Sequence, residues 1–391
     1  MAASRGANQA ALGTFNTNVV LDLIRRSKDG ISRADLARRT GLSAQTITNV
    51  ARGLLEDGLL TEVRMQTGQR GQPPVLLRLR RRSRFAVGVH LDPAVVTFVL
   101  ADLTGEVVAR RQWRAAGDEP VPIAAVTDGI EELLASTGTD RAAVLGVGLA
   151  VPGPIDVAQG MLTHPPLLTG WHMVPLREEV ERRTGFRVWM DKEVIAAATV
   201  PKFMGAEDRR NMVFVFFGSG IAAGLVLNGE VVRGVSGNAG DLAQLAPAGP
   251  PSLFDVTIAS ILARAQGEGV ELDPGSVLQQ FSEVVERAIK EEPVPQRLML
   301  DLAQVTGRLI VGLVNLLDVD DVVIGGPLWD AARSFVLPVI EPMVNDPATR
   351  SSGHLVRISD GPVGSDIAAV GGACLAFAGA LPAVPSRDLL L

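Results

Sequence analysis

The sequence predicts an α/β protein in which a small winged helix-turn-helix module precedes a larger α/β body of two similar lobes. Residues 14–80 combine helical apolar patterns with a β-hairpin pattern, and from residue 85 onward short strand-like apolar runs alternate with helical patterns. The charge also changes, because residues 1–84 hold 15 Lys and Arg against 6 Asp and Glu while the remainder holds 22 against 37. A basic module on an acidic body indicates that only the first part meets a polyanion, for which nucleic acid is a better candidate than an anionic membrane.

The chain length sets the expected domain organisation. With 391 residues, 47% of them apolar, the chain is long enough for two or three domains, since single cores rarely exceed a few hundred residues. We expect a flexible N-terminus (1–13), a winged helix-turn-helix domain (14–80), a basic linker (81–86) and a body (87–391). The body is expected to form one lobe from about 87–200 plus a C-terminal helix, and another from about 201–360.

Cysteine usage and hydropathy limit the cellular setting. Cys374 is the single cysteine, which excludes an internal disulfide and any multi-cysteine metal site and fits a reducing compartment. No segment reaches the roughly 18 unbroken apolar residues of a membrane span, and no long apolar run follows a basic region at the start. We therefore expect a cytoplasmic protein without a membrane partner.

The front module begins with two helical patterns. Apolar residues recur at helical spacing from Asn18 to Arg26, which predicts a first helix. A second helix is predicted to begin after Ser32, whose hydroxyl can cap it while Asp35 answers three residues later, and to end at Gly41. A short turn then leads into a third helix, which is the arrangement of a helix-turn-helix.

The third helix carries the candidate base-reading residues. Its apolar stripe consists of Ile47, Val50, Leu54 and Leu55. Polar side chains at its start and off that stripe combine amide and guanidinium groups, which read base edges, with hydroxyls, which hold phosphates. We assign to DNA binding Ser43, which is also the expected cap, with Gln45, Thr46, Thr48, Asn49 and Arg52. The alternative, on helix pattern alone, is an ordinary three-helix bundle with a polar outer face.

A β-hairpin pattern after the third helix favours DNA binding. The stretch "LLTEVRMQTGQRGQPPVLLRLRRR" alternates apolar and polar residues on both sides of a Gly- and Pro-rich tip. Gln69, Arg70 and Gln72 lie at that tip, and a thin loop with one guanidinium fits a minor groove, where negative potential favours Arg. A solvated hairpin tip is the alternative. The residues that follow, Arg80, Arg81, Arg82 and Arg84, either add phosphate contacts or form a solvated linker.

The body shows two series of alternating strands and helices. Strands are predicted near 85–91, 95–103, 106–113, 143–151, 187–190, 211–234, 321–326 and 354–359, and helices near 123–134 and 174–183 and within 252–318. The order of these motifs resembles the ROK family (repressors, open reading frames and kinases), which is built on the actin-like sugar-kinase fold. The resemblance is carried by the hairpin at Val87, "VGLAVPGPID", "LLTGWHMVPL", "FFGSGIAAGLVLNGEVVRGVSGNAGDLAQL" and "DDVVIGGPL", and with the winged helix it covers the whole chain.

The resemblance makes a kinase conceivable, but the nucleotide corner departs from the family pattern. Kinases of the family carry roughly Asp-x-Gly-Gly-Thr there, and this chain has "HLDPA", from His90 to Ala94. Pro93 lacks an N–H and an ionised Asp92 repels phosphate, so we expect no ATP at this corner. In "GSGIAAG", Gly218 and Gly220 are kept while Ala222 replaces a usual glycine.

The catalytic and metal positions depart as well. Where the resemblance implies a catalytic Asp, "MDKEVIAAA" has Glu193, whose longer arm displaces the base and whose basicity Lys192 would depress by pairing with it or with Asp191. The alternative for this trio is a surface ion-pair cluster. The family's zinc site needs a His and three Cys, and here Gln244 replaces the His and no Cys is present, so we expect no zinc.

The sugar-binding positions implied by the resemblance are also altered, since Leu167 replaces an Asn and Ile195 another polar group. Buried sugar hydroxyls need matched polar partners, so a hexose would be poorly served. A different effector would use residues from the set His164, Trp171, Lys192, Glu193, Asn238, Asp241 and Gln244, with His172 as a further candidate. Each histidine alone is more often structural, and the existence of an effector is left open.

Together these features predict a DNA-binding transcriptional regulator, by default a repressor, with a catalytically inactive ROK body used for oligomerisation and effector sensing. The resemblance implies a homodimer or homotetramer, and two-fold symmetry then predicts a near-palindromic double-stranded DNA operator. The alternatives are an active ROK-type sugar kinase with an accessory DNA-binding domain, and an effector-independent DNA-binding protein.

Overall fold

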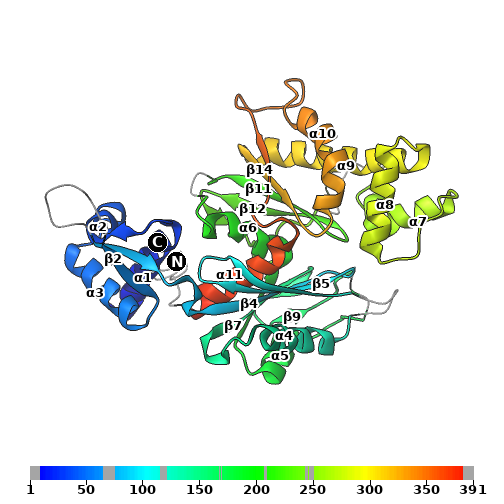
Figure 1. The fold of residues 1–391 in the computed structure, drawn as a ribbon. Helices are drawn as coiled ribbons and strands as arrows, with labels where there is room; N and C mark the ends of the chain where they lie inside the picture. Colours follow the sequence, from blue (N-terminus) through cyan, green and yellow to red (C-terminus); the bar gives the residue numbers. More distant parts are fainter. Residues whose placement is uncertain are drawn as a thin grey trace, which may run out of the picture.

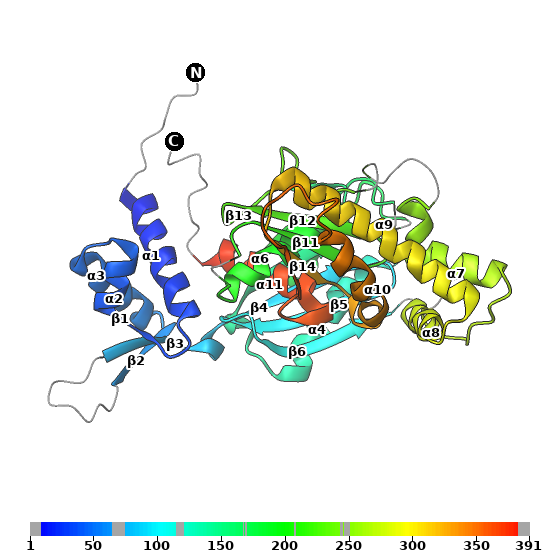
Figure 2. The same ribbon diagram turned by 90° about the horizontal axis from the view of Figure 1, so that it is seen from above.

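The chain folds into a winged helix and two α/β lobes built on separate sheets, as Figure 1 shows. The computed structural model describes residues 9–64, 75–114, 121–166, 168, 170–206, 209–242, 245 and 251–381. Seen from above in Figure 2, the winged helix and the helices α7 and α8 lie at opposite ends of the molecule. The architecture is the predicted mixed α/β fold with its winged helix-turn-helix in front.

The winged helix consists of α1 (Gln9–Arg26), α2 (Arg33–Thr40), α3 (Ala44–Glu56) and a small sheet in the order β1-β3-β2. Its strands are β1 (Ile31–Ser32), β2 (Leu60–Arg64) and β3 (Val75–Leu79). The predicted caps are confirmed, because the hydroxyls of Ser32 and Ser43 each accept a hydrogen bond of 3.1 Å, from the backbone N–H groups of Asp35 and Thr46. The predicted hairpin strands pair antiparallel, and the tip between them lies outside the described residues.

Two boundaries differ from the sequence expectation. The first helix begins at Gln9, within the expected flexible segment 1–13, because Ala10, Ala11 and Leu12 have high helix propensity and extend the pattern. The expected linker 81–86 contains a short 3₁₀ turn (Arg81–Ser83) followed directly by a strand that begins at Phe85. Ala86 is fully buried in a cluster with residues of both the winged helix and the body, so the two parts share a core.

The first lobe has a five-stranded sheet in the order β10-β7-β4-β5-β6. Its strands are β4 (Phe85–Leu91), β5 (Val96–Asp102), β6 (Val107–Trp113), β7 (Val144–Val151) and β10 (Val188–Lys192), and β8 (Ile155–Asp156) and β9 (Met161–Leu162) form a separate ribbon. Helices α4 (Ile123–Thr137) and α5 (Leu176–Thr184) contact it, and α11 (Ile367–Ala380) packs on β4 and β7. Gly148 permits that contact, because a Cβ there would lie 1.7 Å from the carbonyl oxygen of Gly372.

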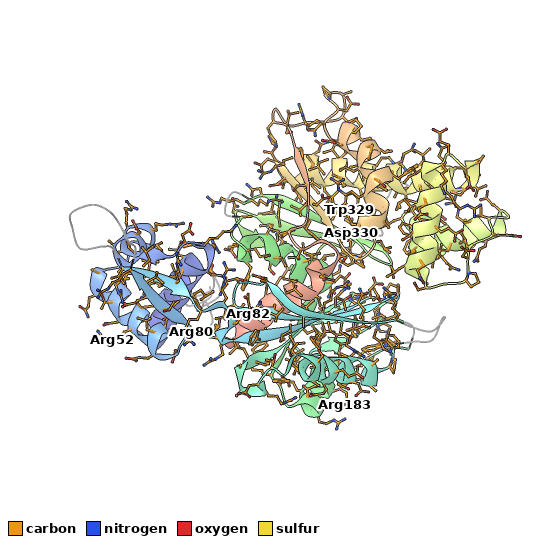
Figure 3. All side chains as sticks on the ribbon, in the orientation of Figure 1. Arg52, Arg80, Arg82, Arg183, Trp329 and Asp330 are labelled. Atoms are coloured by element: carbon orange, nitrogen blue, oxygen red, sulfur yellow. The ribbon has the colours of Figure 1, made fainter. Side chains whose placement is uncertain are left out.

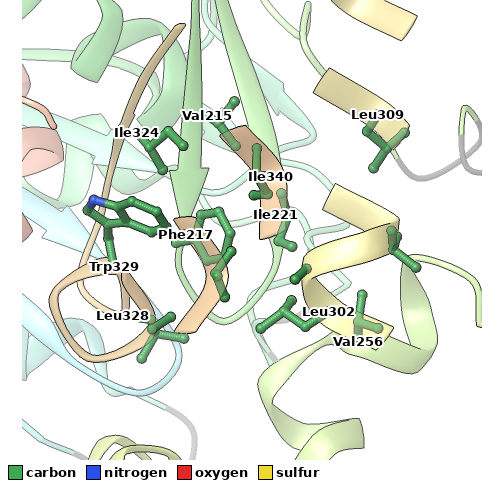
Figure 4. Close-up of a cluster of buried hydrophobic side chains, with 14 of the residues drawn as sticks. Val215, Phe217, Ile221, Val256, Leu302, Leu309, Ile324, Leu328, Trp329 and Ile340 are labelled. Carbon is green, nitrogen blue, oxygen red and sulfur yellow. The ribbon is translucent and has the colours of Figure 1, made fainter. Parts of the chain in front are cut away.

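The second lobe repeats this plan with the sheet order β13-β12-β11-β14-β15. Its strands are β11 (Met212–Phe217), β12 (Ile221–Leu227), β13 (Glu230–Val231), β14 (Asp321–Gly325) and β15 (Arg357–Asp360), and its helices are α7 (Ile258–Gly267), α8 (Val277–Ile289), α9 (Pro293–Leu317) and α10 (Trp329–Val344). Figure 4 shows the core that joins this sheet to its helices, where Phe217 and Trp329 have ring centroids 5.1 Å apart. In each lobe an antiparallel hairpin is extended by parallel strands.

Helix α6 (Glu193–Phe203) lies between the two sheets, where it contacts β12 of one lobe and β7 and α11 of the other. It is buried on nearly every side, so its sequence lacks the one-sided apolar pattern by which the outer helices are predicted. Helix α9 is long and apolar enough to cross a membrane by length and composition alone. Leu298, Leu302 and Leu309 bury its apolar face in the core of the second lobe, so we interpret it as a core helix.

Candidate functional site

The outer face of α3 presents the predicted base-reading side chains. Gln45, Asn49 and Arg52 are exposed, and the Gln45 Nε2 group donates to the Asn49 Oδ1 atom over 3.1 Å. Figure 3 shows Arg52 on the side of the winged helix that faces away from the body. The opposite face of α3 buries Ile47 and Leu54, so the amides and the guanidinium are directed to solvent by the packing of the helix.

The hydroxyl residues at the start of α3 serve the helix as well as its surface. The Ser43 and Thr46 hydroxyl oxygens lie 2.9 Å apart, and the Thr48 hydroxyl donates to the Ala44 carbonyl over 2.8 Å. Ser43 is exposed whereas Thr46 and Thr48 are half-buried. The wing residues Gln69, Arg70 and Gln72 lie outside the described residues, so their assignment to DNA stays a prediction.

A cavity of about 560 Å³ lies between the two lobes and is called here the interlobe cavity. Its walls are largely apolar and include Leu91, Pro93, Pro154, Phe216, Ile221 and Leu253. Its volume lies within the range typical of pockets for small ligands. The polar part of its wall comes from the nucleotide corner, from the start of α6, from the segment after β13 and from Thr257 and Ser260 at the start of α7.

The nucleotide corner is tied to the loop between β11 and β12. The Asp92 carboxylate accepts hydrogen bonds from the backbone N–H and the hydroxyl of Ser219, at 3.0 and 2.7 Å, and from the backbone N–H of Ala94 at 2.9 Å. Asp92 and Ser219 are both buried. The carboxylate therefore engages N–H and hydroxyl donors of "GSGIAAG", the loop that would otherwise face a nucleotide phosphate.

Asp191, Lys192 and Glu193 are all buried, so the alternative of a surface ion-pair cluster is wrong. Arg233 pairs with Asp191 at 3.0 Å, and within the described part of the chain no carboxylate lies within 4.0 Å of the Lys192 ammonium. The expected pairing of Lys192 with a neighbouring acid is therefore absent. Burial raises the pKa of Glu193 to about 8, and the nearby charge of Lys192 offsets this only in part.

Two further polar groups shape the cavity wall. The His90 ring is buried edge-on against Phe216, with centroids 5.3 Å apart, and desolvation lowers its pKa, which keeps the imidazole neutral. Asn238 joins the lobes, because its side-chain oxygen accepts from the Ile155 N–H and its amide donates to the Ile155 carbonyl, both at 2.8 Å.

The structure brings together part of the predicted effector set. Lys192, Glu193, Asn238 and Asp241 line the interlobe cavity. Two other members lie elsewhere. Trp171 is buried, and its indole N–H donates to the Val121 carbonyl over 2.7 Å. His164 is exposed and packs on His172, with ring centroids 4.0 Å apart. Gln244 lies outside the described residues. Trp171 is therefore a structural residue of the first lobe, and the two histidines form a surface pair.

Sequence reasoning missed the contact between the winged helix and the body. The Arg25 guanidinium of α1 donates to the Leu103 carbonyl over 3.1 Å and lies 4.0 Å above the centre of the Phe203 ring. Phe203, at the end of α6, stacks on Phe377 of α11 with centroids 5.8 Å apart. Burial lowers the pKa of Arg25, and the nearby Asp22 carboxylate opposes this. These partners are distant in sequence, so no local pattern indicates them.

No group of three or more His, Cys, Asp or Glu side chains in the described residues is arranged to hold a metal ion. The zinc-binding thiolates of the family pattern are missing from the sequence itself. The expectation of a protein without a metal or nucleotide cofactor stays a prediction.

Two parts of the chain match models of known protein families. Residues 86–251 match the model described as "ROK family", and residues 19–71 match the model described as "MarR family". A xylose repressor of Caldicellulosiruptor bescii is 24% identical, over 81% of this chain and 84% of its own length. A glucokinase of Halalkalibacterium halodurans is 25% identical, over 75% of this chain and 94% of its own length.

The solved structures agree on the fold. The crystal structure of a ROK family transcriptional regulator, described as a homolog of the E. coli MLC protein, has a TM-score of 0.74 at 23% identity and covers 97% of this chain and 99% of its own. That match includes the winged helix, whereas the glucokinase relative covers less of the chain. This chain therefore carries a ROK domain at residues 86–251 behind a MarR-type winged helix at residues 19–71, and it shares its fold with that regulator over nearly its whole length.

Proposed function

We propose that this chain is a DNA-binding transcriptional repressor whose ROK body senses an effector and has no kinase activity. The observation that carries the DNA-binding role is the exposed polar face of α3, with Gln45, Asn49 and Arg52 above a buried apolar stripe. Amide and guanidinium groups on a helix that enters the major groove can read base edges. The family relationship supports repression, because relatives of matching length are named repressors.

The assembly and location follow from the same reading. A homodimer or homotetramer with two-fold symmetry would place paired α3 helices on a near-palindromic double-stranded operator, with the Arg70 wings in the adjacent minor grooves. The exposed Arg80 and Arg82, labelled in Figure 3, lie at the base of the winged helix, where they would add phosphate contacts. We propose a cytoplasmic location for a regulator of this kind, with no membrane partner.

The case against kinase activity rests on Asp92 and Glu193. The Asp92 carboxylate already accepts the Ser219 donors, so a phosphate at that loop would displace a buried carboxylate and meet its charge. Glu193 holds its proton at neutral pH because burial raises its pKa to about 8, which lowers the fraction able to accept a proton from a sugar hydroxyl. Both features support a body that binds without phosphorylating.

The DNA-binding role is tested by selecting bound sequences from random double-stranded DNA and footprinting the full-length protein on the selected site. We expect Gln45→Ala or Asn49→Ala to relax base preference by roughly 1 to 3 kcal/mol, and Arg70→Ala to weaken binding with a smaller salt dependence. Footprints that stay unchanged in all three variants would contradict the assignment. A coupled assay with ATP and a panel of hexoses tests the enzymatic alternative, and robust turnover would refute the inactive body.

The remaining alternative is a DNA-binding protein that responds to no effector. The interlobe cavity favours sensing, because its volume suits a small ligand and its largely apolar wall contains two buried ionisable side chains, Lys192 and Glu193. A thermal-shift screen of small metabolites distinguishes the two, since an effector-independent protein shows no saturable stabilisation.

A further inference from the structure

Most polar side chains that line the interlobe cavity are already hydrogen-bonded within the protein. Asp92 bonds Ser219, and Asn238 bonds the backbone of Ile155. Thr257 and Ser260 bond each other at 2.9 Å, and the Ser260 hydroxyl donates to the Phe254 carbonyl at 2.7 Å, while Asp241 is also engaged. These groups therefore already have hydrogen-bond partners within the protein and do not need a ligand to supply one.

One acidic and one basic side chain that line the cavity lack partners of this kind. The Glu193 Oε2 atom is buried and has no hydrogen-bond partner among the described residues, and the Lys192 ammonium has no carboxylate partner there. Lys192 is 5% exposed and Glu193 is 8% exposed. Burial without a partner disfavours the Lys192 charge and keeps the Glu193 carboxyl protonated, so both groups favour a ligand that supplies the missing partners.

The two groups are consecutive in the chain, at the junction of β10 and α6. Lys192 occupies the N-cap position of α6 without a side-chain capping bond and Glu193 is the first residue of the 11-residue helix, whose N-terminal end favours an anion. The complementary ligand carries an anion and a cation on neighbouring atoms. The rest of the cavity, with Leu91, Phe216, Ile221 and Leu253, offers the remainder of that ligand an apolar surface.

We propose that the interlobe cavity binds a free α-amino acid with an apolar side chain, with its carboxylate on Lys192 and its ammonium group on Glu193. This inference rests on the proposed role of the body as an effector sensor. A hexose fits less well, because each of its hydroxyls needs a polar partner and an unpaired buried one costs about 1 to 3 kcal/mol. Apart from Lys192 and Glu193, His90 is the one polar side chain of the cavity wall that makes no hydrogen bond within the described residues, so a sugar would find few free partners.

The titration of Glu193 gives this binding a characteristic pH dependence. The groups that face Glu193 are Lys192, Asp92, Asp241 and the neutral His90, and burial holds its pKa at about 8. The carboxyl must lose its proton to pair with an ammonium group. The affinity for the ligand is therefore expected to increase about tenfold for each unit by which the pH rises towards 8. A neutral sugar would show no such rise.

The test measures binding to the full-length protein by calorimetry. The probes are L-phenylalanine and L-leucine, with phenethylamine and 3-phenylpropanoate as analogues that lack one charge, and with D-xylose and D-glucose. At least one amino acid should bind saturably and at least about tenfold more tightly than either analogue or sugar, since one charged hydrogen bond is worth this factor. Glu193→Gln and Lys192→Met should each weaken it by a similar factor, and Glu193→Gln should remove the pH dependence.

The matched control is Glu178→Gln, which changes an exposed acid on α5 outside the cavity and should leave binding unchanged. Equal binding of an analogue that lacks one charge, tighter binding of a sugar, or no saturable binding of either amino acid would overturn the inference. Binding of the ligand-free protein to its selected DNA site is measured in parallel for each variant. If the wild-type protein binds no DNA site, the proposed repressor function is refuted. If it binds DNA but fails the ligand test, only the proposed amino-acid ligand is refuted.

Discussion

The hydrogen bonds between Asp92 and Ser219 should contribute substantially to the stability of the body. Asp92→Ala removes two bonds between the lobes and one to Ala94, and it leaves the buried Ser219 N–H without an acceptor. Hydrogen bonds to a charged group contribute roughly 1.5 to 3 kcal/mol each. In the variant, water from the adjacent cavity can bond the exposed donors and recover part of this loss. We expect the free energy of unfolding to fall by about 2 to 4 kcal/mol.

The chain offers a matched control in Asp255→Ala. The Asp255 carboxylate also accepts from the N–H and hydroxyl of one serine, Ser252, at 2.7 and 2.8 Å, but that serine is three residues away in the same turn. Its loss should cost about 1 kcal/mol, as for other local turn and cap bonds. Urea unfolding of both variants measures the difference, and small-angle scattering should show a larger radius of gyration only for Asp92→Ala. Equal costs in the two variants would refute the reasoning.

Three further predictions concern the helix surface, the buried acid and the domain contact. Arg52→Ala should weaken DNA binding and lower the salt slope by about one unit, whereas Arg183→Ala, on the exposed surface of α5, should not; gel shifts over a salt series measure both. The folded-state pKa of Glu193 lies above its ordinary value of 4.5, so the folded protein holds this proton more tightly than the unfolded chain. The resulting contribution to the free energy of unfolding is complete below pH 4.5 and is lost as the pH rises to about 8. Glu193→Gln should flatten this decline, which amounts to about 5 kcal/mol, in urea unfolding at several pH values. Phe203→Ala removes the ring between Arg25 and Phe377 and should lower the stability of the winged helix by about 1 to 3 kcal/mol, seen as earlier proteolysis of that domain.

Local features of this fold were predictable and distant ones were not. The caps at Ser32 and Ser43 follow from bonds between residues three apart, so the sequence contains all the information they need. Trp171 donates to the Val121 carbonyl fifty residues away, a bond that no local pattern indicates, and it does not line the interlobe cavity. The chemistry of "HLDPA" predicted that Asp92 opposes phosphate, but its partner Ser219 is 127 residues away and could not be identified. The same limit applies to α6, whose burial on both sides removes the pattern that reveals an amphipathic helix.

Helix α6 gives the proposed sensing a physical route to the DNA-binding module. Its first residue, Glu193, lines the interlobe cavity, and its last, Phe203, lies beneath Arg25 of α1. At 1.5 Å per residue, its 11 residues span roughly 15 Å. Close packing on both sides leaves α6 little freedom to bend, because α11 touches it closely enough that a Cβ on Gly371 would lie 2.3 Å from the Ala196 carbonyl oxygen. A ligand that moves the start of α6 therefore also moves the Phe203 ring beneath Arg25. If this route carries the signal, Phe203→Ala should still bind DNA but lose the change in DNA affinity that the ligand causes in the wild type.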